Sequence, residues 1–439
     1  MRPKIIVLDD DPTGSQTVHS CLLLTQWDID TLRSGLTDSS PIFFILTNTR
    51  ALTPEEAASV TWEVTHNLKQ AIAQTGTEDF LVVSRSDSTL RGHYPIETDV
   101  IAQELGPFDA HFLIPAFFEG GRFTRDSVHY LNINGVPTPV HQTEFAQDSV
   151  FGYHFSYLPD YVAEKTAGKI AANQVERFLL EDIRAGTQER LRHLTHNQCV
   201  VVDGETQADL DQFATDVLAV AGEGKRFLFR SAASILTALA ALGPQPFPPE
   251  EMGSYALGGK PGAVIVGSHV KKTTQQLERL LQEPGIEGIE VDVSHLLEES
   301  QVQRQAMLQQ ILEQIHQAHA TGHTPVIYTS RQELSFANTQ IRLEFGVAVS
   351  EFLMDLVRGL PKDIGFLISK GGITSNDVLS KGLALGTARL LGQVLAGCSI
   401  VRTPGDHPQF PNLPVVLFPG NVGDEDGLAI VYQRLKPQD

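Results

Sequence analysis

Short apolar runs alternate with amphipathic patterns along the chain. Residues 42–46 and 80–83 are continuous apolar runs of strand length. Between them, Thr53 and Glu56 form a capping box around Pro54, and apolar residues follow at four-residue spacing, as in a helix with one buried face. This alternation predicts repeated strand, helix, strand units and therefore an α/β fold with mainly parallel sheets.

One segment near the middle of the chain interrupts this alternation. Residues 242–262 are dense in proline and glycine and show no periodicity, after which strand-like runs resume. We therefore expect two α/β lobes, formed by residues 1–242 and 263–439 and joined by a linker at residues 243–262. A length of 439 residues suits two such cores, and the active site is expected in the cleft between the lobes.

The first apolar run, residues 5–8, ends on three carboxylates, Asp9, Asp10 and Asp11, followed by a turn at residues 12–15. Open α/β sheets bind ligands at the carboxyl ends of their parallel strands, so this segment is expected at a pocket edge. Three adjacent carboxylates repel one another unless a cation, a proton or hydrogen-bond donors compensate. The alternative interpretation is a helix cap and turn, which Asp, Pro, Thr and Gly also favour.

Two further segments that follow apolar runs carry arginines. Residues 84–93 combine arginines and hydroxyls with one carboxylate, and residues 115–124 place an arginine beside two glycines. Arginine binds carboxylates through paired hydrogen bonds and hydroxyls suit a polyol, so the first segment would accept a small acidic sugar. The alternatives are a solvated loop with local ion pairs and an ordinary glycine turn.

Three glycine-bearing loops follow apolar runs in the second half, at residues 267–269, 369–374 and 419–424. Free backbone N–H groups in such loops can bind phosphate oxygens, so together they predict a nucleotide phosphate site, although glycine turns are common. The segment at residues 253–261 has proline where a P-loop needs Ser or Thr, and no dinucleotide fingerprint or zinc spacing is present.

Composition and charge restrict the possible partners. A formal net charge of −20 argues against binding to nucleic acid, and an anionic substrate would need local basic residues. No apolar stretch near the N-terminus is long enough for a signal peptide or a membrane span. Cys21, Cys199 and Cys398 are too few and too far apart for a disulfide framework, which favours a cytoplasmic location.

Taken together, these motifs resemble the four-carbon acid sugar kinase family. Asp10-Asp11-Pro12-Thr13-Gly14-Ser15 is similar to the family's Asp-Asp-x-Thr-Gly-Ala, and Asp87-Ser88-Thr89-Leu90-Arg91-Gly92 matches its Asp-Ser-Thr-Leu-Arg-Gly. The resemblance runs nearly end to end. Further matching segments are Pro115-Ala116-Phe117, Gly121-Arg122, Val202-Asp203, Asp209-Leu210, Gly267-Ser268, Gly371-Gly372-Ile373-Thr374 and Pro419-Gly420-Asn421-Val422-Gly423-Asp424.

The resemblance implies an amino-terminal sugar-acid lobe, a carboxyl-terminal ATP lobe, and transfer of the γ-phosphoryl group of ATP, with Mg²⁺, to a hydroxyl of a threonate, erythronate or oxo-tetronate. Asp10 or Asp11 is expected to act as the base, with Arg91 and Arg122 on the substrate carboxylate. The other expected substrate-binding residues are Thr13, Gly14, Arg85, Asp87 and Ser88. The expected nucleotide-binding residues are Ser268, Gly371, Gly372, Ile373, Thr374, Gly420, Asn421 and Gly423. No metal ligand is assigned, and whether the chain forms a homo-oligomer is left open.

Four positions depart from the family pattern. The family usually has a glutamate where this chain has Ile373, a lysine where it has Phe418 and a phenylalanine where it has Val422. Losing both charged groups near the phosphates would change how the metal or the γ-phosphate is handled. Pro12 replaces a leucine and stiffens the acidic loop.

Two other functions fit parts of the sequence. Asp9-x-Asp11-x-Thr13 after a strand also fits the nucleophile motif of haloacid-dehalogenase-like phosphatases, in which Asp9 would attack the phosphate. The distal lysine and acidic pair which that chemistry needs are poorly matched here. A non-catalytic sensor of sugar acids or nucleotides is the third hypothesis, because of the changes at Ile373 and Phe418.

Overall fold

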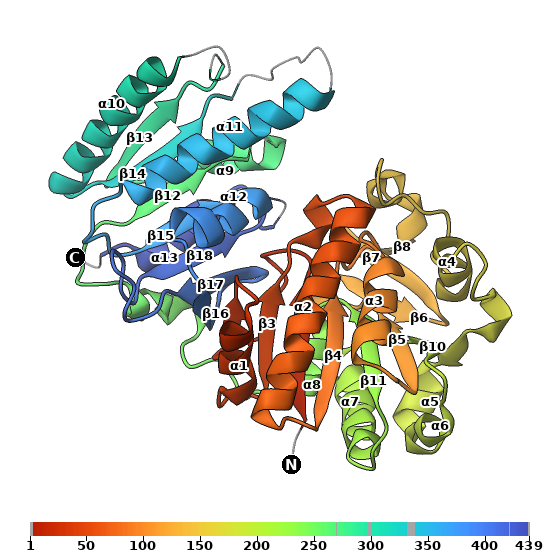
Figure 1. Cartoon of the computed structure of the whole chain (residues 1–439). Coiled ribbons are helices and arrows are strands. Elements are labelled where there is room, and N and C mark those ends of the chain that lie inside the picture. The colour runs from red at the N-terminus through yellow and green to blue at the C-terminus, as the bar shows by residue number, and fades with distance from the viewer. Residues whose placement is uncertain are drawn as a thin grey trace. The chain divides into compact units, whose positions relative to one another are not determined.

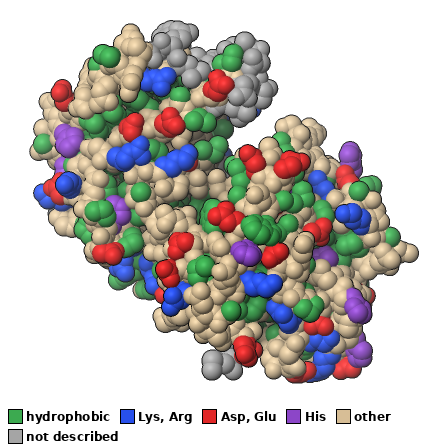
Figure 2. Space-filling model, in the orientation of Figure 1, with side chains coloured by type: hydrophobic (Ala, Val, Ile, Leu, Met, Phe, Trp, Pro, Cys, Tyr) green, Lys and Arg blue, Asp and Glu red, His purple; other side chains and the backbone are tan. Residues whose placement is uncertain are grey.

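The computed structural model of the protein describes residues 3–268, 270–294, 296, 300–331, 339–420 and 422–437. The chain divides into two compact units, Met1–Pro244 and Gln245–Asp439. Each unit is built on a largely parallel β-sheet with helices packed against it, as the alternating pattern predicts (Figure 1). Acidic and basic side chains are interspersed on the face of the first unit seen in Figure 2.

The main sheet of the first unit has the strand order β2-β3-β1-β4-β11-β5-β10-β9, and every neighbouring pair is parallel. The carboxyl ends of these strands therefore share one edge of the sheet. The strands are β1 (Lys4–Asp9), β2 (Leu22–Leu24), β3 (Ile42–Leu46), β4 (Phe80–Arg85), β5 (Ala110–Ile114), β9 (Glu176–Phe178), β10 (Gln198–Val202) and β11 (Phe227–Ser231).

Helices cover both faces of this sheet. The main ones are α1 (Ile29–Thr37), α2 (Pro54–Thr75), α3 (Ile96–Leu105) and α7 (Gln207–Ala221), with α4 (Leu158–Lys165), α5 (Leu180–Ala185), α6 (Gln188–His193) and α8 (Ser234–Ala240) around them. On one face, α1, α2 and α3 pack on side chains such as Ile6 and Leu8. On the other, Phe213 of α7 contacts Phe112 of β5, with 5.3 Å between ring centroids. The capping box of Thr53 and Glu56 is confirmed at the start of α2.

A small antiparallel sheet accompanies the main sheet of the first unit. It consists of β6 (Arg122–Arg125), β7 (Val128–Ile133) and β8 (Val136–Pro139), in that order. Thr124 of β6 exchanges backbone hydrogen bonds with Gly204, which follows β10. This contact fixes β6, and with it Arg122, near the end of the main sheet.

The sheet of the second unit has the order β13-β14-β12-β15-β18-β17-β16, parallel from β13 to β18 and antiparallel beyond. Its strands are β12 (Ala263–Val266), β13 (Ile286–Val291), β14 (Thr324–Thr329), β15 (Leu367–Lys370), β16 (Thr387–Leu395), β17 (Cys398–Arg402) and β18 (Pro414–Phe418). Its helices are α9 (Lys271–Leu280), α10 (Gln301–Ala320), α11 (Thr339–Arg358), α12 (Gly372–Asp377) and α13 (Gly427–Leu435).

Residues 245–262, most of the segment predicted as a linker, belong to the second unit. Met252 is fully buried in the core that α9 and α13 form with the sheet, and Gln245 donates to the carbonyl of Gln393 at 3.1 Å. The proline and glycine content therefore reflects an irregular segment that packs on the second unit.

Two further observations concern the helices and the cysteines. In the described part of the chain, no helix is both long enough and apolar enough to cross a membrane. Cys21, Cys199 and Cys398 are buried cysteines that form no disulfide in the described part of the chain.

Candidate functional site

The carboxyl edge of the first sheet brings together segments that are far apart in sequence. Strand β1 lies between β3 and β4, and Asp9 is in register with Leu46 on one side and Arg85 on the other. The acidic loop therefore lies beside the segments that follow β3 and β4. Sequence reasoning placed candidate residues after β1 and β4 but overlooked the segment after β3.

Arg50, from that overlooked segment, is the centre of the site. Its guanidinium forms an ion pair with Asp11, lies 3.4 Å from Asp87 Oδ1 and is 3.7 Å from Asp10 Oδ1. Burial raises the pKa of Asp11 and of Asp87, but Arg50 outweighs this effect together with Thr13 and Arg85 at Asp11 and with Arg91 and Thr89 at Asp87, so the pKa of each carboxyl is lowered. Arg50 is thus the cation that Asp10, Asp11 and Asp87 share.

Asp10 lies deeper than Asp11. Its carboxylate accepts a hydrogen bond from Ser86 Oγ at 2.5 Å, and Oδ1 has no hydrogen-bond partner among the described residues. Burial raises the pKa of Asp10, and the nearby Glu97 adds to the effect against the opposing pull of Arg50. Arg230 donates to Ser86 at 2.8 Å and pairs with Glu97 at 2.5 Å, so a buried polar layer fixes Asp10 from below.

Asp9 and Arg85 form an ion pair behind the site. Arg85 Nη1 is 3.3 Å from Asp9 Oδ1, and Asp9 is only 1% exposed. Burial raises the pKa of Asp9 to about 7. A Cβ atom at Gly14 would lie 2.1 Å from both carboxylate oxygens of Asp9, so the acidic loop packs directly on this carboxyl group. Arg85 is therefore held by Asp9, and Asp9 is shielded from any phosphate ester, which disfavours the phosphatase hypothesis.

Three other predicted residues lie around Asp11 and Asp87. Arg91 donates from Nε to Asp87 at 2.8 Å, and its guanidinium stacks 4.9 Å from the centroid of the Phe145 ring. Thr13 donates through its backbone N–H to Asp11 at 2.8 Å. Ser88 is buried, and its carbonyl lies 2.8 Å from the Nε2 atom of His129. The side chains of Arg91 and Asp11 are partly exposed. Ser88 is buried, and its carbonyl contact with His129 stabilises the loop.

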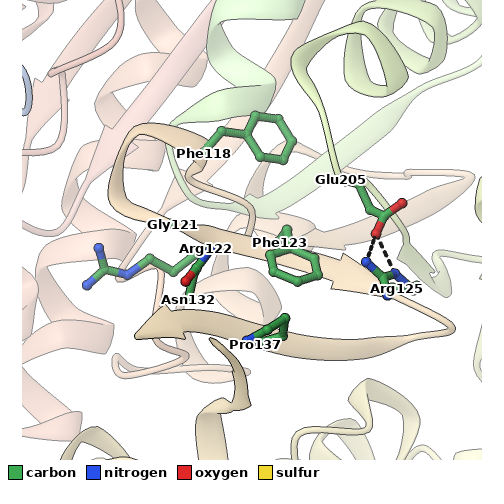
Figure 3. Close-up of a pocket in the computed structure, with 8 residues that line it drawn as sticks. All are labelled: Phe118, Gly121, Arg122, Phe123, Arg125, Asn132, Pro137 and Glu205. Carbon is green, nitrogen blue, oxygen red and sulfur yellow. Dashed lines mark hydrogen bonds and ion pairs between the residues drawn. The ribbon is translucent and has the colours of Figure 1, made fainter. Parts of the chain in front are cut away.

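Arg122 lines a pocket of about 370 Å³ on the small antiparallel sheet. Its Nη1 donates to the carbonyl of Gly120 at 2.5 Å, while its buried Nε has no hydrogen-bond partner among the described residues. Figure 3 shows the guanidinium groups of Arg122 and Arg125 at opposite ends of the pocket, with Arg125 paired to Glu205. The other residues that line it are Phe118, Gly121, Phe123, Asn132 and Pro137.

In the second unit, the loops after the adjacent strands β12, β15 and β18 meet. A Cβ atom at Gly267 would lie 2.4 Å from Thr374 Oγ1, and one at Gly371 would lie 3.1 Å from Ser268 Cβ. The backbone N–H of Gly371, which has a φ of +118°, donates to the carbonyl of Phe418 at 2.8 Å. These short distances leave no room for a side chain larger than hydrogen at Gly267 and Gly371. The peptide groups of the three loops therefore lie close together at one edge of the sheet.

Helix α9 holds the third of these loops. Gln276, which is fully buried, donates to the carbonyls of Val422 at 3.0 Å and Asp424 at 2.6 Å. Lys272 donates to the carbonyl of Gly423 at 3.1 Å. The predicted residue Asn421 lies outside the described residues.

Ile373 and Arg331 border these loops. Ile373 is 71% exposed in the first turn of α12, next to the predicted Gly372. Arg331, which the sequence did not suggest, donates to the carbonyl of Ser268 at 2.6 Å and to that of Thr329 at 2.9 Å. Arg331 follows β14, as Arg50 follows β3. In both cases the sequence feature that could have identified the residue is a basic side chain shortly after the end of a strand.

No group of three or more His, Cys, Asp or Glu side chains is placed to hold a metal ion within the described ranges. Magnesium in phosphoryl-transfer sites is usually bound by substrate phosphates, water and one or two carboxylates.

Comparison with known proteins matches two family models to this chain, one within each of its two compact units. The family model described as a sugar-binding N-terminal domain matches residues 5–239, and the model described as a nucleotide-binding C-terminal domain matches residues 263–428. These matches define a two-domain protein that combines sugar-binding and nucleotide-binding domains. The chain belongs to the four-carbon acid sugar kinase family.

A curated relative and two solved structures extend the comparison. D-erythronate kinase of Heliobacterium modesticaldum is 27% identical over 288 residues, which cover 62% of this chain but only 59% of the relative. A Haemophilus influenzae protein of the DUF1537 family has a TM-score of 0.63 at 16% identity, covering 98% of this chain and all of the other. A protein described as a putative tRNA synthase from Salmonella typhimurium LT2 has a TM-score of 0.68 at 19% identity, covering 98% of each chain. These two structures share the fold.

Proposed function

We propose that this protein is an ATP-dependent kinase that transfers the γ-phosphoryl group to a hydroxyl of a four-carbon acid sugar. The observation that carries the proposal is the pairing of a sugar-binding and a nucleotide-binding domain of one kinase family in a single chain. The similarity to a D-erythronate kinase supports erythronate as the first acceptor to test, with threonate and oxo-tetronates as the other candidates.

The proposed acceptor site uses the exposed part of the charged cluster. Arg91 and Arg122 bind the substrate carboxylate, because guanidinium groups match carboxylates with paired hydrogen bonds. The Nε of Arg122 has no hydrogen-bond partner among the residues that the structure describes, and this supports the role, since a buried donor without an acceptor is costly. Asp87 and Thr13 lie beside Arg91 and Asp11 and would bind the sugar hydroxyls.

Asp11 is the better candidate for contact with the attacking hydroxyl. Its side chain is 23% exposed, whereas that of Asp10 is 1% exposed and bound by Ser86. The lowered pKa of Asp11 keeps it ionised at neutral pH, which suits a carboxylate that orients a hydroxyl in a loose transition state. Asp10 then positions Asp11 and Arg50, and does not itself touch the substrate.

The loops at Ser268, Gly371 to Thr374 and Gly420 are the proposed phosphate site. Backbone N–H groups at tight glycine turns and at the start of a helix bind phosphate oxygens without bulky side chains. Magnesium bound to the ATP phosphates would neutralise charge on the transferred group. Within the chain, the residues supply orientation of the two substrates and exclusion of water.

The decisive experiment measures ADP formation with each acid of a panel of erythronates, threonates and oxo-tetronates, and identifies the phosphorylated product by NMR. Turnover that requires one of these acids supports the proposal. Tight binding of acid and nucleotide without product would instead favour a sensor.

A matched pair of variants tests the role of each carboxylate. Asp11→Asn is expected to lower kcat at least 100-fold, within the range typical of a positioned carboxylate. Asp10→Asn is expected to lower kcat less and to lower the melting temperature, because it acts through its neighbours. Asp30→Asn, at an exposed site paired with Arg33, is the control and should leave kcat unchanged. Full turnover in Asp11→Asn would show that this assignment is wrong.

A further inference from the structure

Lys370, the last residue of β15, lies beneath the proposed nucleotide loops and has had no role so far. Its side chain is fully buried, and its Nζ donates to the carbonyl of Pro419 at 2.6 Å. The same ammonium lies 4.2 Å from the centroid of the Phe418 ring. Lysine is almost never fully buried without a charged partner, so this position calls for an explanation.

The immediate surroundings leave the charge of Lys370 uncompensated. An ammonium has three donors, and among the described residues only Pro419 accepts from it, with no carboxylate in ion-pair contact. The titratable groups that influence it are Cys398 of β17 and Lys272 of α9. Burial lowers the pKa of Lys370 to about 7, and Lys272 acts in the same direction, opposed by Cys398.

The register of the sheet shows where this charge is placed. Lys370 on β15 is directly paired with Phe418 on β18, so both side chains lie on the same face of the sheet. Neighbouring parallel strands are about 4.8 Å apart, so a long side chain on either strand can bring its ammonium to nearly the same place.

We propose that Lys370 is a positioning residue of the nucleotide site, and that it supplies from β15 a positive charge beneath the loop that follows β18. This inference rests on the proposed nucleotide-dependent function. The ammonium holds the carbonyl of Pro419 at the start of the loop, and its charge stabilises phosphates bound to the loop. In a buried setting such an interaction is strong even without direct contact.

A linked protonation follows from this placement. Bound phosphates favour the charged amine, so nucleotide binding raises the pKa of Lys370 from its value near 7. Above pH 7 the free protein must therefore take up a proton when nucleotide binds. The association constant is expected to fall by up to 10-fold per pH unit between pH 7 and the raised pKa.

The test measures binding of Mg-ADP by titration calorimetry at pH 8, in buffers of different ionisation enthalpy, which reports proton uptake directly. The wild-type protein is expected to take up close to one proton. Lys370→Met should lose this uptake and bind Mg-ADP on the order of 10-fold more weakly at pH 7. The exposed Lys362→Met variant is the matched control and should resemble wild type.

A charge-relocation variant separates this role from packing. Lys370→Met combined with Phe418→Lys should recover part of the lost affinity, which a purely structural lysine would not predict. Lys370→Met should melt no lower than wild type, because removing a buried charge is often neutral or stabilising.

The outcomes distinguish this inference from the proposed function. If wild type binds no Mg-ADP, the nucleotide-dependent function itself fails. If wild type binds but Lys370→Met shows the same affinity and proton uptake, the role of Lys370 is refuted. If Lys370→Met does not fold, the wild-type titration decides, because absence of proton uptake at pH 8 overturns the inference.

Discussion

Replacing Arg50 with methionine should strongly destabilise the first unit at neutral pH. The substitution keeps most of the apolar stem but removes the cation shared by Asp10, Asp11 and Asp87. The Arg50 side chain is 18% exposed and none of the three carboxylates exceeds 23%, so solvent screens these pairs only weakly. Breaking a buried ion pair by removing one partner costs about 3–5 kcal/mol.

The loss should depend on pH. In the wild type, the pKa values of Asp11 and Asp87 are lowered, so their stabilising effect is present above the unfolded pKa near 3.9 and is lost as the pH falls below it. Without Arg50, the effect of burial on both pKa values is opposed less strongly, so the carboxyls accept protons at a higher pH than in the wild type. The deficit of Arg50→Met should therefore be largest at pH 7.5 and smaller at pH 5.

Calorimetric melting of the full chain measures this effect. For a unit of this size, about 3–5 kcal/mol corresponds to a fall of about 6–20 °C in the melting temperature of the first unit. The control is Arg33→Met, which removes an exposed pair with Asp30 and should change stability by less than about 1 kcal/mol. A melting temperature for Arg50→Met within 2 °C of wild type at pH 7.5, or an equal deficit at pH 5, would refute this reasoning.

Three other measurements test the site. The pKa of Asp9 in the folded protein is raised to about 7, so the contribution of Asp9 to the unfolding free energy falls between pH 4 and pH 7. Asp9→Asn removes this contribution, and its unfolding free energy should therefore change with pH in this range with a more positive slope than that of the wild type. Urea titrations at several pH values measure both slopes. Gly14→Ala, which places a Cβ against Asp9, should lose about 1–3 kcal/mol, whereas the unobstructed helical Gly346→Ala should gain up to about 1 kcal/mol in the same titrations. Arg91→Lys should raise the KM for the acid about 10-fold or more in steady-state assays and leave the KM for ATP unchanged.

The strands could be predicted because most are continuous apolar runs buried on both faces. The runs at residues 42–46 and 263–266 coincide with β3 and β12, and the run at residues 80–83 is extended by two polar residues in β4. Such runs have few alternative structures in a soluble chain. Loop positions at strand ends followed from the same pattern.

The partners of the charged residues could not be predicted in the same way. Arg85 is a predicted substrate-binding residue whose partner the sequence did not indicate. Strands β1 and β4 are in register at Asp9 and Arg85, so the two side chains lie on one face and pair. Asp9 and Arg85 are 76 positions apart in sequence, so their pairing depends on how the two strands align in the folded sheet and cannot be predicted from local sequence patterns. Arg50 was missed for a related reason, since only the strand order β3-β1-β4 shows that the segment after β3 borders the acidic loop.

The first unit has a buried layer of charged residues and a partly exposed layer above it. This difference matters for directed evolution of its specificity. Asp9, Asp10, Arg85 and Arg230 are 4% exposed or less and fix one another, so a library that varies them would mainly yield unfolded protein. Arg91 stacks on Phe145 and reaches toward Asp148 at 3.7 Å, and substitutions at Phe145 and Asp148 leave that buried layer intact. Under the proposed function, new acceptor acids are therefore best sought by varying Phe145 and Asp148, where substitutions cost little folding stability.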